Sequence, residues 1–417
     1  MKPIFGILVT CLILLTPDIA SGQNDSTGYI QVEGTILDSR TGDPMVYARV
    51  YIAGTGIGTI ANQEGQFILK IPAQLAGESV VVSSIGYENK VMTVEQLRGD
   101  PGPIMLAVQP IELEEVTIIG TDARKLLEEA LGRIEENYCN KPLMLTAFYR
   151  ENIRKRKKYV SISEAVLEAY KSPYNNYFEI DKVSILKARK GNDLNSRDTV
   201  ILKLQGGPMT TFQLDFVKYP YGLLDRDVLD YYHFSVNGMI TLDGRSAFVI
   251  SFEQTSETDL PFYEGRIYVN VEDLAILGAE YHLTKRNIKN AREFMVQKEP
   301  PGSRIDITSA TYQVYYRHLD NFWMLSSVRS EINLEILWDD RTFSSNYTVR
   351  AEMVVTDLDS LHISKLRDRP LLRNKDVFVE KVEDFQDPEF WGAYNIIHPE
   401  EDLRTAIRRI GLKMKED

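Results

Sequence analysis

Two residues near the C-terminal end, His398 and Glu401, have the His-x-x-Glu spacing of a zinc-binding pair. A catalytic zinc ion takes three protein ligands and keeps one position open, but no histidine follows Glu401. The sequence also contains no His-Glu-x-x-His, no Gly-x-Ser-x-Gly and no Walker-type phosphate loop. We therefore expect no metal, no cofactor and no catalytic residues, and we expect that the chain is not an enzyme.

A run of five positive charges is the other segment whose residue types suggest chemistry. It consists of Arg154, Lys155, Arg156, Lys157 and Lys158. The run fits a solvated turn between two strands, Phe148–Ile153 and Tyr159–Ile162. It also offers a contact for an anionic partner, such as lipopolysaccharide or a phosphate headgroup. We take these residues as the candidate contact for an anionic partner.

The composition excludes several classes of protein. With 48 Lys and Arg against 60 Asp and Glu, the net charge is −12, which argues against a nucleic-acid partner. An apolar fraction of 43% is too high for a disordered chain. The length of 417 residues allows roughly two or three domains, each with its own core.

The N-terminal residues predict export. Met1 and Lys2 precede an apolar stretch, Ile4–Leu15, and small residues end at Gly22, as in a secretory signal peptide. The apolar stretch is too short to cross a membrane, so we expect no transmembrane segment in the mature chain. Cleavage leaves Cys139 as the single cysteine, which excludes an intramolecular disulfide and predicts a buried thiol.

Short strands separated by glycine-rich turns follow from Ile30 to Leu106, which predicts an all-β sandwich. The residues at its turns and strand ends, 32–38, 42–44, 48–50, 54–59, 62–67 and 84–87, closely resemble the carboxypeptidase regulatory-like domain. The resemblance implies a transthyretin-like fold of the kind common in envelope proteins of Bacteroidetes-type bacteria. It implies no peptidase activity, because a fold does not determine a function.

The segment Leu113–Gly120 is similar to the one that follows this domain in SusC-type TonB-dependent transporters. Such a receptor needs a plug and a 22-stranded barrel, and residues 121–417 are too few for both. The domain is therefore expected to serve here as a borrowed module.

A helix and a long β region are predicted next. Asp122 can cap a helix whose apolar residues, from Leu126 to Tyr138, recur at helical spacing and would dock one domain on the next. From Leu145 to Val355 strand patterns dominate, with hairpin turns expected at Asn237-Gly238, Asp243-Gly244 and Asp320-Asn321. Thr284–Val296 is expected to be a helical or loop insertion.

This alternation predicts an antiparallel meander with one apolar and one polar face. The segment Tyr263–Leu277 looks like the strands of periplasmic lipoprotein carriers of the LolA/LolB type, whose half-open barrels accept lipid. The inner face is then either hollow or filled, and close packing favours a filled core.

The C-terminal part carries two further patterns. Residues 387–397 and 147–151 resemble stretches of Bacteroidetes proteins that begin with the same regulatory-like domain. After Pro399, acidic residues lead, basic residues follow, and Leu403, Ile407 and Ile410 form a stripe that predicts an amphipathic docking helix.

Together these features predict a mainly β protein: an N-terminal transthyretin-like β-sandwich and a larger antiparallel sheet, packed or half-barrel in form. We expect a signal peptide (1–22), the sandwich (23–110), a connecting strand and linker helix (111–142), the meander domain (143–360) and a C-terminal extension with an amphipathic helix (361–417).

The expected function is that of a non-catalytic, exported binding or assembly module in the periplasm or at the periplasmic face of the outer membrane. Its partner would be an envelope protein, a glycan or a lipid. Two alternatives remain open: a periplasmic carrier of lipid or another amphiphile, and a hydrolase with an unfamiliar site.

Overall fold

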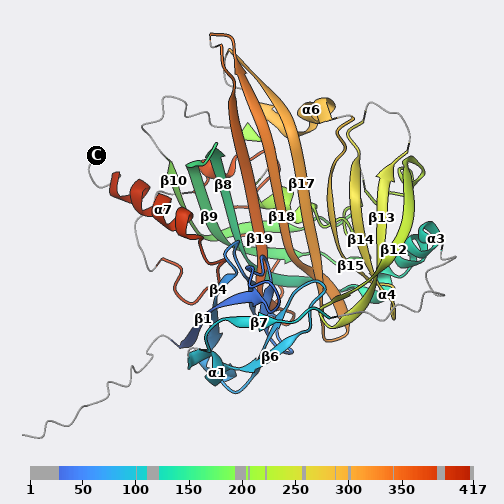
Figure 1. Ribbon diagram of the computed structural model, residues 1–417, viewed down its shortest axis with the longest axis vertical. Helices are drawn as coiled ribbons and strands as arrows, with labels where there is room; N and C mark the ends of the chain where they lie inside the picture. The colour runs from blue at the N-terminus through green and yellow to red at the C-terminus, as the bar shows by residue number, and fades with distance from the viewer. Residues whose placement is uncertain are drawn as a thin grey trace, which may run out of the picture.

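The structure is a computed structural model that describes residues 28–99, 101–109, 122–192, 203–204, 207–220, 223–255, 260–286, 288–298, 302–340, 342–382 and 390–413. The signal peptide expected over 1–22 and the segment 113–120 lie outside these residues. The fold is mainly β, as expected, with a small N-terminal sandwich and one large antiparallel sheet (Figure 1).

Two small sheets form the sandwich. The first has the order β4-β1-β7 and the second the order β3-β2-β5-β6. Their strands are β1 (Tyr29–Asp38), β2 (Arg49–Ile52), β3 (Gly58–Ile60), β4 (Gln66–Pro72), β5 (Ser79–Ser83), β6 (Lys90–Thr93) and β7 (Ile104–Leu106). Helix α1 (Val94–Arg98) begins at Thr93, whose hydroxyl caps it. Buried aliphatic residues such as Val50, Leu69 and Val82 fill the space between the sheets.

Ten strands form the large sheet in the order β10-β9-β8-β19-β18-β17-β15-β14-β13-β12, and every neighbouring pair is antiparallel. The strands are β8 (Leu143–Lys155), β9 (Lys158–Lys171), β10 (Lys182–Asn192), β12 (Tyr232–Leu242), β13 (Arg245–Gln254), β14 (Tyr263–Asn270), β15 (Ile276–Leu283), β17 (Ser303–Leu319), β18 (Phe322–Trp338) and β19 (Ser345–Asp359). The sheet is not closed into a barrel.

The two faces of this sheet differ in chemistry because side chains alternate along each strand. On β18, Val328, Ile332 and Leu334 contribute to the main core, whereas Arg329 and Glu331 point to the opposite face. The apolar face, which we call the inner face, is covered by α3 (Ala123–Gly132), α4 (Ile134–Asn137) and α5 (Pro208–Gln213). The described residues thus pack against much of the inner face.

Smaller elements connect the strands. They are η1 (Ala73–Leu75), β11 (Lys203–Leu204), η2 (Leu229–Tyr231), η3 (Ile288–Asn290), α6 (Ala291–Met295), β16 (Val296–Lys298), η4 (Phe378–Glu380) and α7 (Glu401–Lys413). The insertion expected over 284–296 contains η3 and α6. The expected docking helix is α7, whose Leu403 and Ala406 pack against Tyr159 and Ile162 of β9.

Two of the three expected hairpin turns are confirmed. Asp243 and Gly244 both have positive φ between β12 and β13, and Asp320 has φ 53° between β17 and β18. The turn expected at Asn237-Gly238 is wrong, because β12 runs through both residues. Their neighbours Val236 and Met239 pair with Ile250 and Phe248 of the same strand, so the extra residue forms a bulge.

The linker helix is also shorter than expected. Asp122 caps α3 by accepting from the backbone N–H groups of Arg124 and Lys125, as its position predicts. The helical pattern then divides, because α3 ends at Gly132 and α4 ends at Asn137 before extended Tyr138. Both helices pack on the inner face of the large sheet, and Cys139 beside them is buried with a free thiol.

Candidate binding site

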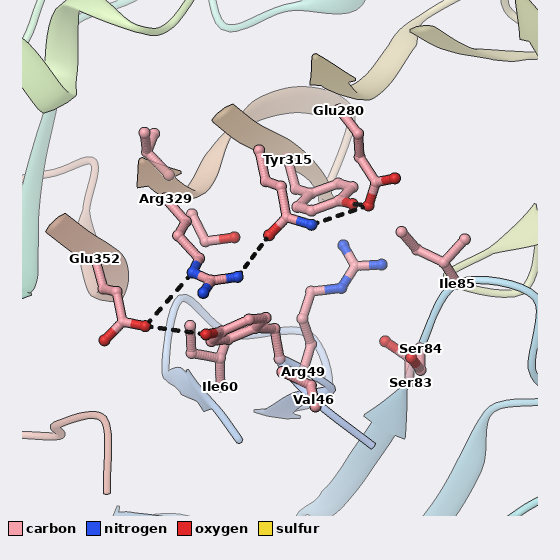
Figure 2. A pocket seen from close by; sticks show the side chains of 14 residues that line it. Val46, Arg49, Ile60, Ser83, Ser84, Ile85, Glu280, Tyr315, Arg329 and Glu352 are labelled. Atoms are coloured by element: carbon pink, nitrogen blue, oxygen red, sulfur yellow. Dashed lines mark hydrogen bonds and ion pairs between the residues drawn. The ribbon is translucent and has the colours of Figure 1, made fainter. Parts of the chain in front are cut away.

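The sandwich lies against the polar outer face of the large sheet, at the lower end of the molecule in Figure 1. A pocket of about 180 Å³ opens at this junction (Figure 2). Its walls come from the sandwich and from the outer face of β15, β17, β18 and β19. They consist of Val46, Tyr47, Arg49, Ile60, Ser83, Ser84, Ile85, Glu280, Gln313, Tyr315, Ser327, Val328, Arg329 and Glu352.

Arg49 supplies the main positive charge from the sandwich side. It is only 8% exposed, and strand β2 carries its side chain into the junction. Its Nη1 donates to the carbonyl oxygen of Tyr316 at 3.3 Å and lies 3.4 Å from Oδ2 of Asp243. Its Nε and Nη2 make no hydrogen bond to any described residue, and Figure 2 shows the guanidinium projecting into the pocket.

Asp243 holds Arg49 in this position. It lies in the tight β12–β13 turn of the large sheet, and its Oδ1 accepts from Tyr51 Oη at 3.0 Å and from Ser83 Oγ at 2.7 Å. Burial, together with the negative charge of Asp243, raises the pKa of Tyr51 well above its ordinary value, so the phenol stays protonated and donates. The carboxylate thus connects two strands of the sandwich to a turn of the sheet.

Arg329 supplies a second positive charge from β18. Its Nη1 donates to Oε1 of Gln313 at 3.4 Å, and its Nε lies 3.7 Å from Oε1 of Glu352. The ring of Tyr47 stacks on the guanidinium at 4.3 Å, and Tyr47 Oη donates to Glu352 at 3.2 Å. These contacts fix the Arg329 side chain at the edge of the pocket.

The carboxylate of Glu280 on β15 is already occupied. It accepts hydrogen bonds from the hydroxyl of Tyr315, from Gln313 Nε2 at 3.2 Å and from Tyr268 Oη at 3.2 Å. Glu280, Gln313 and Arg329 also line a second hollow of about 480 Å³ that continues along the outer face past Arg266 and His282. The two hollows thus share these three residues as a common wall.

The chemistry of the pocket favours an anion. Both carboxylates on its walls, Glu280 and Glu352, are engaged by protein donors, whereas Arg49 keeps donors directed at the empty volume. A buried guanidinium recognises carboxylate or phosphate oxygens because it offers several N–H groups in one plane. Within the described ranges, no group of three His, Cys, Asp or Glu residues lies close enough to hold a metal ion.

The sequence-predicted basic run does not contribute to this pocket. Arg156 and Lys157 form the turn between β8 and β9, as expected for a turn, and both are exposed. Lys155 and Arg156 instead line a separate hollow beside Phe343. The His398–Glu401 pair also stays apart from the pocket: His398 is half-buried, and burial together with Arg404 lowers the pKa of its imidazole.

The residues that sequence reasoning missed are Arg49, Arg329 and Glu280. Arg329 and Gln313 carry a usable signal, since each is a polar residue on the outer face of an alternating strand. Arg49 carries none, because its partner Asp243 lies far along the chain in another domain.

A buried ion network fastens the C-terminal segment next to the pocket. Arg150 on β8 is fully buried; its Nε donates to Glu164 at 2.7 Å and its Nη2 to the carbonyl oxygen of Ile397 at 2.7 Å. Burial raises the pKa of Glu164, but Arg189 and Arg150 more than offset this effect and leave that pKa below its ordinary value. Arg150 belongs to the 147–151 stretch noted in the sequence, and its role here is structural.

The geometry thus defines a β-sandwich docked on an open antiparallel sheet, with a pocket at the junction whose charged wall residues are Arg49, Arg329, Glu280 and Glu352. Residues 32–118 match the family model described as the CarboxypepD_reg-like domain, which confirms the resemblance expected for the sandwich. No curated protein matches the chain.

The solved structures that are similar to more than half of the chain include the following three. A DUF1329 family protein from Desulfovibrio piger has 11% identity and a TM-score of 0.25, over 59% of this chain and 97% of that chain. A LolA superfamily protein from Nitrosomonas europaea has 10% identity and a TM-score of 0.22, over 57% and 95%. MucB, solved in complex with MucA, has 12% identity and a TM-score of 0.18, over 58% and 100%.

Proposed function

We propose that this protein is an exported, non-catalytic binding module of the cell envelope. Its ligand carries an anionic group, a carboxylate or a phosphate, that enters the junction pocket. The observation that carries this proposal is Arg49, a buried guanidinium whose Nε and Nη2 face the pocket without a hydrogen-bond partner among the described residues. A bound anion would supply the missing acceptors.

The construction of the pocket supports binding over bond-breaking. Each wall residue with a charge is oriented by at least one neighbour, as Asp243 orients Arg49 and as Tyr47 orients Arg329. Binding sites gain affinity from such pre-organisation, because little side-chain freedom is lost on association. Since sandwich and sheet both contribute charges, a bound ligand would also tie the two domains together.

The proposed location follows from the N-terminal sequence. The apolar stretch and small residues over 1–22 have the form of a cleaved signal, which directs the mature chain to the periplasm or to the periplasmic face of the outer membrane. None of the described helices has the length and apolar character needed to span a membrane.

The lipid-carrier alternative needs an opening on the apolar inner face. That face is occupied by side chains of α3 and α5 and by Phe378 and Val382 of the C-terminal region. A carrier would have to move these segments to admit an acyl chain. We therefore favour the outer-face pocket as the ligand site.

Matched acidic and neutral probes test the proposal. Galacturonate is compared with galactose, and glycerol 3-phosphate with glycerol, by saturation-transfer NMR and calorimetry on the full mature chain. We expect at least one acid to bind about tenfold more tightly than its neutral match, since a charged hydrogen bond contributes roughly 1.5–3 kcal/mol. Arg49→Gln should abolish the difference, whereas Arg40→Gln, at an exposed position, should preserve it.

Two outcomes would contradict the proposal. One is that neither acid binds better than its neutral match. The other is a preference for acids that survives in the Arg49→Gln protein, provided that its thermal unfolding shows that it is folded.

A further inference from the structure

The upper end of the large sheet carries a second surface, formed by two neighbouring loops. The β8–β9 turn at Arg156 and Lys157 lies beside the loop that joins β18 to β19. Arg156 N donates to the carbonyl oxygen of Asn346 at 3.2 Å, and Lys155 pairs with Tyr347 across the strands. In Figure 1 strands β17, β18 and β19 rise to this end, away from the sandwich.

An open hollow of about 560 Å³ lies between the two loops. Its lining consists of Lys155, Arg156, Thr342, Phe343, Ser344 and Ser345. Two cations, several hydroxyl groups and one phenyl ring therefore meet at one place. Cations and hydroxyl groups recognise phosphate oxygens, and a phenyl ring favours an apolar phase.

Two large apolar side chains are exposed at this end. Phe343 is 83% exposed and Leu337, at the end of β18, is 41% exposed. Arg156, Lys157 and Lys158 are exposed next to them. The acidic residues of the same loop, Asp339 and Asp340, are fewer than the four cations from Lys155 to Lys158.

The charge of this surface opposes that of the whole protein. The chain has a net charge of −12, yet its largest run of cations lies at this one end. Arg156 also adopts φ 56°, a left-handed conformation that glycine or asparagine would take with less strain.

We propose that this tip surface, defined by Lys155, Arg156, Lys157, Lys158, Leu337 and Phe343, docks on a bilayer that contains anionic phosphate headgroups. The basic residues contact the headgroups, and Phe343 enters the boundary between headgroups and acyl chains. Binding of a free phosphate ion would use the cations but leave the Phe343 ring exposed to water. Burial of the ring is favourable only in an apolar phase, such as that of a bilayer. In this orientation the sandwich points away from the membrane (Figure 1).

Vesicle sedimentation tests this proposal with the full mature chain. Vesicles of phosphatidylglycerol mixed with phosphatidylcholine are compared with vesicles of phosphatidylcholine alone, at low and at high salt. We expect binding to the anionic vesicles only, weakened by salt. The test variant combines Arg156→Gly, Lys157→Gln and Lys158→Gln. Each of the three lost charges should lower the affinity for anionic vesicles about fivefold, since one basic residue near an anionic surface contributes about that factor.

The variants distinguish docking from stability. Arg156→Gly relieves the positive φ, so this change should leave unfolding unharmed while it weakens vesicle binding. Phe343→Ser should also weaken binding. The matched controls Lys90→Gln, Lys125→Gln and Phe178→Ser change exposed residues outside the tip and should bind as the natural protein does.

Three results would overturn the proposal: equal binding to neutral and anionic vesicles, tip variants that bind as tightly as the natural protein, or controls that weaken binding as much as the tip variants. Because the tip and the junction pocket share no residue, each of these results leaves the pocket proposal standing.

Discussion

Two buried lysines beneath the inner face have opposite electrostatic environments. Lys171 on β9 lies 2.7 Å from Asp181 and 2.7 Å from Asp215. Burial lowers the pKa of Lys171, but the two aspartates more than offset burial and raise that pKa above its ordinary value. The ammonium group of Lys218 donates to the carbonyl oxygens of Pro173 and Asn176, at 2.5 Å each, and among the described residues it has no carboxylate partner.

Lys218 therefore predicts a pH dependence of stability. Burial, reinforced by the charge of Lys171, lowers the pKa of Lys218 from its ordinary value of 10.5 to about 8. Between these two values the unfolded chain binds more protons at this site than the folded chain, so the contribution of Lys218 to stability rises with pH there. The effect opposes that of Lys171, whose raised pKa contributes stability that is lost above pH 10.5.

The measurement compares the free energy of unfolding in urea at several pH values between 7 and 10 for the natural protein and for Lys218→Met. We expect the free energy of unfolding of the natural protein to increase relative to that of Lys218→Met as the pH rises. A constant difference between the two proteins across this pH range would show that the pKa of Lys218 is not lowered in the folded chain. Lys125→Met, at an exposed position, serves as the control.

At the residue scale the sequence allowed one of the two candidate surfaces to be predicted. The basic run from Arg154 to Lys158 is contiguous, so its charge and its turn are visible without a structure. The junction pocket is not visible in the sequence, because Arg49 and Arg329 come together only when the sandwich docks on β18. No local pattern encodes a contact between side chains of different domains.

At the element scale, glycines set how closely the strands beside the pocket approach. Gly265 on β14 faces β15, and a Cβ atom at this position would lie 2.2 Å from the carbonyl oxygen of Glu280 and 2.6 Å from the Cα of Tyr281. Both contacts are with backbone, which cannot rotate away. The close approach keeps Glu280 in the wall shared by the two hollows.

Gly265→Ala should therefore push β14 and β15 apart. We expect a loss of about 1–3 kcal/mol in the free energy of unfolding, the usual cost of overpacking. Gly77→Ala is the matched control, because nothing lies within 4 Å of its added Cβ. A Gly265→Ala protein as stable as this control in urea would contradict the packing described for these strands.

The hairpin signals show which elements a sequence can predict. Asp243-Gly244 forms the expected turn, with φ of 57° and 76°. Asn237-Gly238 has the same kind of dipeptide but forms a bulge, since residues on both sides of it pair with β13. The dipeptide allows positive φ, and the register with the neighbouring strand decides whether it forms a β-bulge or a hairpin turn.

At the scale of the whole molecule, three parts interlock. Thr59 of the sandwich donates to the carbonyl oxygen of Ile396 at 2.8 Å, and Asn395 exchanges hydrogen bonds with the backbone of Lys70. Ile396 and Trp391 then share a small core with Phe148 of the large sheet. The C-terminal segment thus lies between the sandwich and the sheet and joins them.

This arrangement explains what could not be predicted about the molecule. The sandwich and the antiparallel sheet follow from local alternation and turn residues, and the family model supports the sandwich. Part of their contact is made through residues 390–397, which have neither a strand pattern nor a helix pattern of their own. A segment that is ordered by its neighbours leaves no periodic signal in its own sequence.

The most direct test of the central claim is a crystal structure of the mature protein soaked with galacturonate and, separately, with glycerol 3-phosphate. The account predicts that the anionic group of at least one of them lies within hydrogen-bond distance of Arg49 Nε or Nη2, in the pocket between the sandwich and β18. Acid density found only elsewhere on the molecule, with Nε and Nη2 of Arg49 contacting only water, would contradict it.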